Sequence, residues 1–183
     1  VFGNASIEKT TRNACYLKYR FSLPCDIYQG AALPLYAPPE APPTFVHGED
    51  GLGDAGLDVP DVAQQPDAVR FIIDTIRENP GEITIVAVGR MTNLAIALTL
   101  APDIAALTKA VVIMGGVTGL AGIPGNVSPV AEANIVGDPH AADIIMRADW
   151  DLTMVGLDVT MQTLMSPKMT EELKNEGGEA GRF

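Results

Sequence analysis

The sequence predicts an α/β fold with an open, mainly parallel sheet flanked by helices. Two apolar runs, Ile83–Val88 and Ala110–Met114, do not alternate polar with apolar residues, so both faces of each strand are expected to be covered. Segments with helical spacing of apolar residues alternate with these runs along the chain. A third apolar run, Leu152–Leu157, follows another such segment and continues the alternation. We find no repeat or linker, so residues 1–183 are expected to form a single domain.

The chain begins with the expected tail of a strand, Val1–Gly3. Ser6 is a suitable N-cap for the first helix, because apolar positions then recur at helical spacing from Ile7 to Leu17. This helix is predicted to end near Pro24.

A short strand is predicted at Asp26–Tyr28, followed by a long loop over Leu33–Thr44, which contains five prolines in twelve residues. Pro66 suits the first turn of a second helix. Its apolar face extends from Val69 to Ile76 and precedes the helix-terminating sequence Asn-Pro-Gly.

The second half of the chain repeats the order of strand and helix. Its expected elements are a strand at Ile83–Val88, a helix at about Thr92–Leu100, a short helical piece at Ile104–Lys109, a strand at Ala110–Met114, a glycine-rich stretch at Gly115–Gly125, a helix at Pro139–Arg147, a strand at Leu152–Leu157, and a helical region at Met169–Phe183.

Composition excludes several classes of partner. Twelve Lys and Arg residues against 23 Asp and Glu give a formal net charge of −11, which opposes binding to nucleic acid or to an anionic membrane. The most apolar stretch, Leu94–Leu107, is interrupted by Pro102 and Asp103 and is too short to span a membrane. Cys15 and Cys25 form no zinc or CxxC spacing, so a reducing, cytoplasmic compartment is expected.

Common motifs for nucleotide binding and for serine hydrolysis are absent or misplaced. A GxGxxG sequence occurs at Gly51, Gly53 and Gly56, but it does not follow a predicted strand and no helical pattern opens after it. A dinucleotide site is therefore not expected. The sequence contains no Walker A motif and no GxSxG nucleophile elbow.

A polar set follows the carboxyl ends of the predicted strands, where open α/β sheets bind ligands. Asn and Glu side chains beside glycines suit a ligand with many hydroxyl groups. The alternatives are that Asn93 caps a helix, Asn126 supports a turn and Glu132 is solvated. The set comprises Gly89–Asn93, Gly115–Gly116, Gly125–Asn126, Glu132–Asn134 and Asp158.

Two histidines receive different interpretations. His47 opens the sequence HGEDGLGD, a polar loop expected to be flexible and to cover a ligand, although a surface histidine is the alternative. His140 follows Asp138, which is expected to cap a helix, so His140 is expected to be exposed and without a chemical role.

Six segments together resemble a known family, the inosine-uridine preferring nucleoside hydrolases. This resemblance implies an open α/β sheet and hydrolysis of the N-glycosidic bond of ribonucleosides, with a Ca²⁺ ion as cofactor. The segments are, in order, FGNASIEKTTRNA, HGEDGLGD, PGEITIVAVGRMTNLAIAL, VVIMGG, GNVSPVAEANIVGDPHAA and TMVGLDVT.

The resemblance also implies roles for individual residues. The Val88 carbonyl oxygen is matched to a calcium ligand. The substrate-facing residues are implied to be Asn4 and Met114 at the ribose, Asn126 and Glu132 at its 5′-hydroxyl, Asn134 near the reacting carbon, and His47 at the nucleobase.

The chain departs from the family pattern in several places. Ala133 stands where the family often has Phe, and Met161 where it often has a polar or basic residue. The family's N-terminal aspartate cluster is expected before Val1, and its His-Asp pair after Phe183. The chain is therefore expected to be an incomplete domain, inactive by itself and dimeric or tetrameric when complete. The alternative is a catalytically inactive fragment or a module that binds sugars or nucleosides.

Overall fold

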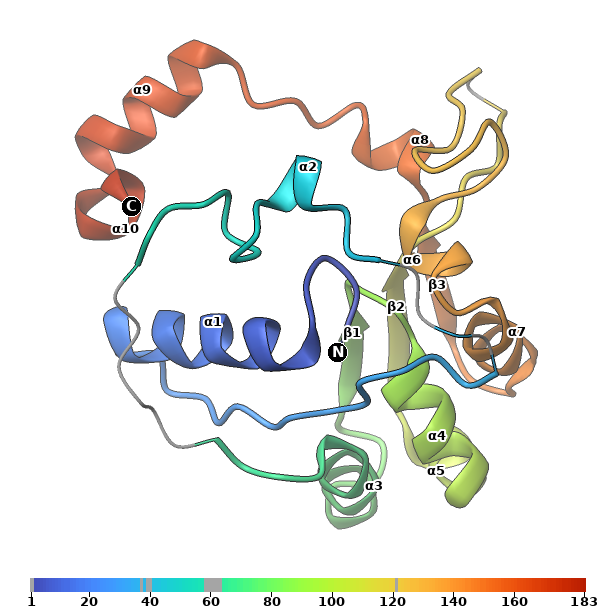
Figure 1. The fold of residues 1–183 in the computed structure, drawn as a ribbon. Helices are drawn as coiled ribbons and strands as arrows, with labels where there is room; N and C mark the ends of the chain where they lie inside the picture. The colour runs from blue at the N-terminus through green and yellow to red at the C-terminus, as the bar shows by residue number, and fades with distance from the viewer. Residues whose placement is uncertain (1, 37, 39–40, 58–63, 121) are drawn as a thin grey trace.

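The computed structural model describes residues 2–36, 38, 41–57, 64–120 and 122–183. Its centre is a parallel sheet of three strands in the order β1-β2-β3, where β1 is Thr84–Ala87, β2 is Ala110–Met114 and β3 is Leu152–Val155 (Figure 1). This arrangement confirms the predicted α/β class and the parallel sheet.

Helices connect these strands along the chain (Figure 1). Their bounds are α1 Ile7–Arg20, α2 Thr44–His47, α3 Ala68–Glu78, α4 Thr92–Leu100, α5 Ile104–Leu107, α6 Ala133–Val136, α7 Pro139–Arg147, α8 Leu157–Thr160, α9 Pro167–Glu176 and α10 Gly178–Arg182.

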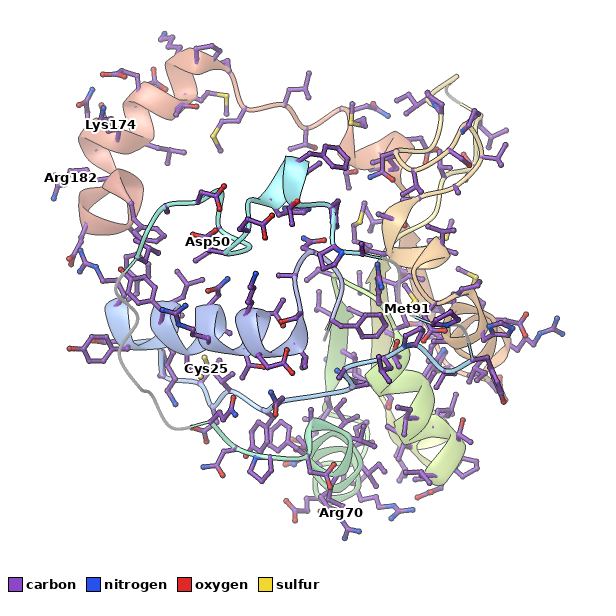
Figure 2. All side chains as sticks on the ribbon, viewed as in Figure 1. Cys25, Asp50, Arg70, Met91, Lys174 and Arg182 are labelled. Carbon is purple, nitrogen blue, oxygen red and sulfur yellow. The ribbon has the colours of Figure 1, made fainter. Side chains whose placement is uncertain are left out.

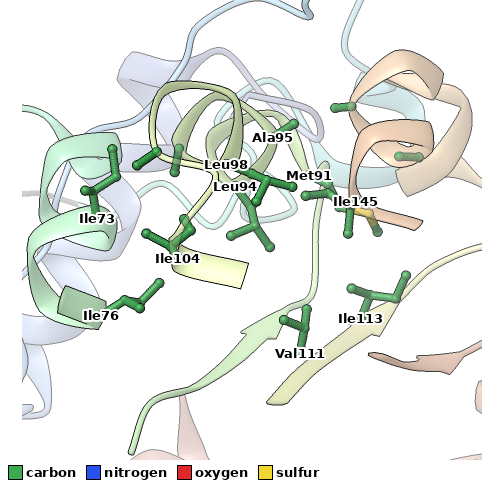
Figure 3. Packing of buried hydrophobic residues seen from close by; sticks show 14 residues of the cluster. Ile73, Ile76, Met91, Leu94, Ala95, Leu98, Ile104, Val111, Ile113 and Ile145 are labelled. Carbon is green, nitrogen blue, oxygen red and sulfur yellow. The ribbon is translucent and has the colours of Figure 1, made fainter. Parts of the chain in front are cut away.

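The main hydrophobic core lies between the sheet and helices α3, α4 and α7 (Figure 3). In the middle strand, Val111 and Ile113 are fully buried and point to the same face, because side chains two residues apart in a strand share a face. Ile145 of α7 and Ile104 of α5 are also fully buried in this core. The apolar face predicted for the second helix, now α3, packs in this core through Ile73 and Ile76.

The expectation that both faces of the sheet are covered is wrong for the described residues. Val86 is 64% exposed and Val88 is 73% exposed, although both belong to the apolar run ITIVAV. The helices of the core cover only the face that bears Val111. An uninterrupted apolar run indicates that both faces of a strand can be buried, but it does not indicate which elements pack on each face.

Two predicted helix caps are confirmed. The Ser6 side chain accepts a hydrogen bond from the Lys9 backbone N–H, and the Asp138 side chain accepts one from that of Ala141. The second helix begins later than predicted, because Asp67, rather than a residue before Pro66, caps α3. Asp67 adopts a left-handed backbone conformation and accepts from the Arg70 N–H.

Several predicted boundaries need correction. Asp26–Tyr28 is no strand, since it contributes only an isolated parallel bridge between Tyr28 and Gln65. At the N-terminus, Phe2 and Gly3 form no strand, and Val1 lies outside the described residues. Helix α1 already ends at Arg20. Strands β1 and β3 are shorter than their apolar runs, because pairing stops before the apolar residues do.

Three helices of one turn, α2, α6 and α8, were not predicted, whereas the short helical piece predicted at Ile104–Lys109 forms the one-turn helix α5. The C-terminal region is helical as predicted. Helix α10 brings Phe183 against the rings of Tyr16 and Phe21 on the side of α1. Within the described part of the chain, no helix is both long and apolar enough to cross a membrane.

Candidate functional site

A cavity of about 760 Å³ lies where the loops after β1 and β2 meet the segments around α1 and α2. This volume is in the range of small-molecule sites. The segments that line the cavity are far apart in sequence, so only the tertiary fold brings them together. The lining residues are Phe2, Gly3, Asn4, Thr10, Ala41, Pro42, Pro43, Thr44, Phe45, Val46, His47, Val88, Gly89, Arg90, Asn126, Val127, Ala133, Asn134 and Val136.

Asn4 and His47 line the cavity from its N-terminal side. Asn4 lies two residues before the Ser6 cap of α1, and His47 is the last residue of α2. His47 is half-buried, whereas Asn4 is exposed. His47 is therefore neither a core residue nor fully exposed to solvent.

Val88 lines the cavity directly after β1, at the carboxyl end of that strand. Two residues later Arg90 also lines it, with its guanidinium carbon 4.7 Å from the centre of the Phe2 ring. This distance corresponds to a cation–π contact. The residues after β1 therefore line a cavity at the end of the strand where open α/β sheets commonly bind ligands.

Asn126 and Asn134 line the cavity from the segment after β2. The Asn126 side-chain oxygen accepts a hydrogen bond from the Ala133 N–H at 2.9 Å. The Asn134 amide donates to the Met114 carbonyl oxygen at 3.0 Å and lies 3.3 Å from the Met114 sulfur. Asn134 and the last residue of β2 are thus held together, while Met114 itself does not line the cavity as described.

Glu132 is almost fully buried, at 3% exposure, so the alternative that it is solvated is wrong. Its Oε2 atom accepts hydrogen bonds from the backbone N–H groups of Gly116, Asn134 and Ile135, at 2.8, 3.0 and 3.2 Å. Among the residues that the structure describes, its Oε1 atom accepts only from the Asn134 N–H, at 3.0 Å. Glu132 therefore caps α6 and joins it to the loop after β2, and Oε1 retains capacity to accept another hydrogen bond.

The other polar residues singled out from the sequence have structural partners. Asn93 does not cap α4. Its side-chain oxygen instead accepts from the Ala31 N–H at 2.7 Å. His140 is exposed, as expected, and its ring packs edge-on against that of Tyr36. Met161 is 49% exposed and is not among the cavity residues.

Asp158 lies in α8 and is 9% exposed. Its Oδ2 atom accepts a hydrogen bond from the Thr118 hydroxyl at 2.6 Å, and this bond lowers the pKa of the Asp158 carboxyl below its ordinary value. The contact joins α8 to the glycine-rich stretch after β2. Asp158 does not line the cavity as described.

Sequence reasoning included Arg90 in the polar set but gave it no role of its own, and it did not select Thr10 or Phe45, which also line the cavity. Arg90 carried a usable signal, because it follows a strand and a glycine in the polar set. Thr10 occupies a helical position without a distinguishing pattern. Phe45 is 91% exposed and directly follows the proline-rich loop predicted at Leu33–Thr44.

The described residues do not by themselves form a calcium site. The part of the chain that the structure describes contains no group of three or more His, Cys, Asp and Glu side chains suited to a metal ion. The Val88 carbonyl would be one oxygen ligand, whereas Ca²⁺ takes six to eight. The polar side chains that line the cavity include the amides of three asparagines, the His47 imidazole and the Arg90 guanidinium.

The family model of the inosine-uridine preferring nucleoside hydrolases matches residues 1–183. The chain belongs to this family. The match agrees with the resemblance in the sequence motifs and with the open parallel sheet.

A probable uridine nucleosidase of Oryza sativa subsp. japonica is 37% identical over 185 residues, covering 100% of this chain and 56% of the relative. A solved plant nucleoside hydrolase is 36% identical with a TM-score of 0.91, covering 100% of this chain and 57% of that chain. A purine-preferring ribonucleoside hydrolase from Gardnerella vaginalis is 37% identical with a TM-score of 0.88, covering 99% and 58%. This chain thus spans little more than half the length of these nucleoside hydrolases.

Proposed function

We propose that the protein carrying this chain hydrolyses the N-glycosidic bond of ribonucleosides and releases ribose and the free base. The cavity that unites Asn4, His47, Asn126 and Asn134 is the main observation in favour of this proposal. Membership of the nucleoside hydrolase family supports the same reaction.

In the proposed reaction, the bond between the ribose carbon and the base nitrogen breaks and water adds to the carbon. Positive charge develops on the ribose ring, as in other glycosidic cleavages. Asn4 and Asn134 would hold the ribose hydroxyls, with Met114 positioned by the Asn134 amide at the end of β2. Polar groups fixed before the reaction stabilise such charge without further reorganisation.

Asn126 and Glu132 would bind the 5′-hydroxyl end of the ribose. Glu132 is buried and is not among the cavity residues described, so its role at the substrate rests on the resemblance in the sequence motifs, while its Oε1 atom keeps capacity to accept from a hydroxyl. Glu132 would then hold the substrate and the loop after β2 with one carboxylate.

His47 would lie at the nucleobase and assist its departure by hydrogen bonding or proton donation. We assign the activation of water to no residue of this chain. Calcium, predicted from the resemblance, would need ligands beyond the Val88 carbonyl, so no step is assigned to it. Association into dimers or tetramers and a cytoplasmic location likewise remain predictions.

The test is hydrolysis of inosine and uridine by the protein that carries this chain, measured as the release of reducing sugar. The assay is run once with added calcium and once with a chelator. We expect cleavage of at least one nucleoside. His47→Ala should lower turnover of natural nucleosides but spare p-nitrophenyl riboside, whose leaving group departs without protonation. Similar losses on both substrates, with folding intact, would assign His47 to the ribose or to the loop structure.

The second candidate is a module that binds sugars or nucleosides without cleaving them. The cavity supports this candidate too, because its amide groups suit binding as well as catalysis. Saturable binding of inosine or uridine by calorimetry, without sugar release in any condition above, would favour this candidate over the enzyme.

A further inference from the structure

The loop of residues 47–54, here named the His47 loop, is held in shape by its own hydrogen bonds. The Asp50 Oδ1 atom accepts from the N–H groups of Leu52 at 2.7 Å and Asp54 at 2.9 Å. The Gly53 N–H donates to the His47 carbonyl oxygen at 2.8 Å. These bonds differ from the sequence expectation of a flexible loop.

Asp54, at the other end of the His47 loop, also accepts hydrogen bonds from backbone N–H groups of the loop. Its Oδ1 atom accepts from the N–H groups of Glu49 at 2.6 Å and Asp50 at 3.4 Å. Gly48 permits this closure, because it has a φ of +72° and a Cβ there would lie 2.5 Å from the Asp54 nitrogen. The two aspartates therefore bridge the loop in both directions.

Two side chains of helix α1 donate hydrogen bonds to backbone carbonyl groups of the His47 loop. The Asn13 side-chain amide donates to the Asp50 carbonyl oxygen at 2.9 Å, and the Lys9 ammonium donates to the Glu49 carbonyl oxygen. Figure 2 shows Asp50 in the loop between α2 and α1. Asn13 is half-buried, whereas the Lys9 side chain is 46% exposed, so the Asn13 bond is better shielded from water.

The loop also packs closely on the start of α1. A Cβ at Gly51 would lie 2.9 Å from the Ala5 Cβ and 3.3 Å from the Asn13 Nδ2 atom. Ala5 follows Asn4 directly in the chain. The loop that follows His47 therefore lies against both Ala5, the neighbour of Asn4, and Asn13 of α1.

We propose that Asn13 is a positioning residue that anchors the His47 loop to α1, so that His47 and Asn4 face one cavity in a fixed relation. This inference rests on the proposed function, in which Asn4 contacts ribose and His47 contacts the base. Asn13 itself does not line the cavity as described and acts through the Asp50 carbonyl.

The discriminating variant is Asn13→Asp, which keeps the size of the side chain but replaces the donor with an oxygen that faces another oxygen. In the protein that carries this chain, we expect turnover of inosine or uridine to fall about tenfold, as for loss of one partly buried hydrogen bond. Hydrolysis of p-nitrophenyl riboside should stay near the unmodified level, because it does not need His47.

A double variant separates positioning from general damage. In a His47→Ala background, Asn13→Asp should cause no further loss on natural nucleosides, because both changes remove the same contribution. Arg12→Ala, an exposed neighbour on α1, should leave both substrates unchanged. If Asn13→Asp does not fold, Lys9→Met removes the other anchor and should give a smaller loss with the same selectivity.

Additive losses in the double variant, or equal losses on both substrates, would overturn the proposal. Amide hydrogen exchange tests the anchor without any activity. The Leu52 and Asp54 N–H groups should exchange faster in Asn13→Asp than in Arg12→Ala. Unchanged exchange would overturn the anchor even if the protein is active. Faster exchange in a protein that cleaves no nucleoside would uphold the anchor while the proposed function fails.

Discussion

At the residue scale, the cavity owes its shape to polar side chains that bond to backbone groups from another segment. Glu132 bonds to Gly116, Asn134 bonds to Met114, and Asn126 bonds to the Ala133 N–H. Each of these side chains thus serves the fold in addition to the role proposed for it at the substrate. A substitution at such a residue is expected to have both a structural and a functional effect, which paired substrates can separate.

Glu132→Gln should weaken turnover of ribonucleosides more than turnover of 5′-deoxyribonucleosides. The amide retains one acceptor oxygen but loses the charge, so the hydrogen bond proposed to the 5′-hydroxyl becomes weaker. We expect kcat/KM for the ribonucleoside to fall by about tenfold or more. The measurement is kcat/KM for uridine and 5′-deoxyuridine, with Glu171→Gln, an exposed residue, as the control. Equal losses on both substrates would assign Glu132 to loop structure alone.

Thr118→Val should reduce stability at neutral pH and remove part of its acid dependence. The Thr118 hydroxyl lowers the pKa of Asp158, so its contribution is present above the ordinary carboxyl pKa and is lost as pH falls. The free energies of unfolding of variant and unmodified chain should therefore converge below about pH 4. Denaturant unfolding from pH 3 to 7 checks this, with exposed Thr163→Val as control. A constant difference across that range would contradict it.

At the element scale, caps decide where several helices start. Asp138 is 1% exposed and accepts from the Ala141 N–H, the Thr92 hydroxyl and the Leu35 N–H. It therefore joins α7 to the start of α4 and to the segment that contains Leu35. Ser166 caps α9 through a single exposed bond, from the Met169 N–H at 3.2 Å.

Asp138→Ala should destabilise the chain by roughly 2–4 kcal/mol, because it removes a cap and leaves several buried donors without a partner. Ser166→Ala should cost about 1 kcal/mol or less, since water replaces the lost bond. Denaturant unfolding of both variants measures the difference. Similar costs for the two would mean that the buried network around Asp138 adds nothing beyond capping.

The two faces of the sheet should respond differently to truncation of a valine. Val111→Ala should cost about 2–3 kcal/mol, because Val111 is fully buried in the core. Val86→Ala should cost less than about 1 kcal/mol, because Val86 is 64% exposed. Equal costs in this chain would indicate that the face bearing Val86 is covered in solution.

At the scale of the whole molecule, this chain should lack a tight calcium site. The described residues present the Val88 carbonyl but no cluster of acidic side chains beside it, and hard cations need about six or more oxygens. Calorimetric titration of the 183-residue chain with calcium measures this property. A micromolar site with stoichiometric occupancy would show that ligands are present that we have not recognised.

Local patterns in the sequence were enough to predict β2, α4 and α7 at the bounds the structure gives them, and the caps at Ser6 and Asp138. Periodicity and capping depend on residues within a few positions of one another, so they can be interpreted without the tertiary fold. The carboxyl ends of the strands also indicated the polar segment after β2.

Only the tertiary structure decided which segments share the cavity and which face of the sheet is covered. Asn4, His47, Asn126 and Asn134 meet because the chain folds back on itself, and no pattern near any one of them encodes that meeting. The same holds for the bond from Asn13 to Asp50, which joins residues 37 positions apart. Such contacts depend on the packing of whole elements, and a sequence pattern specifies each element without fixing its neighbours.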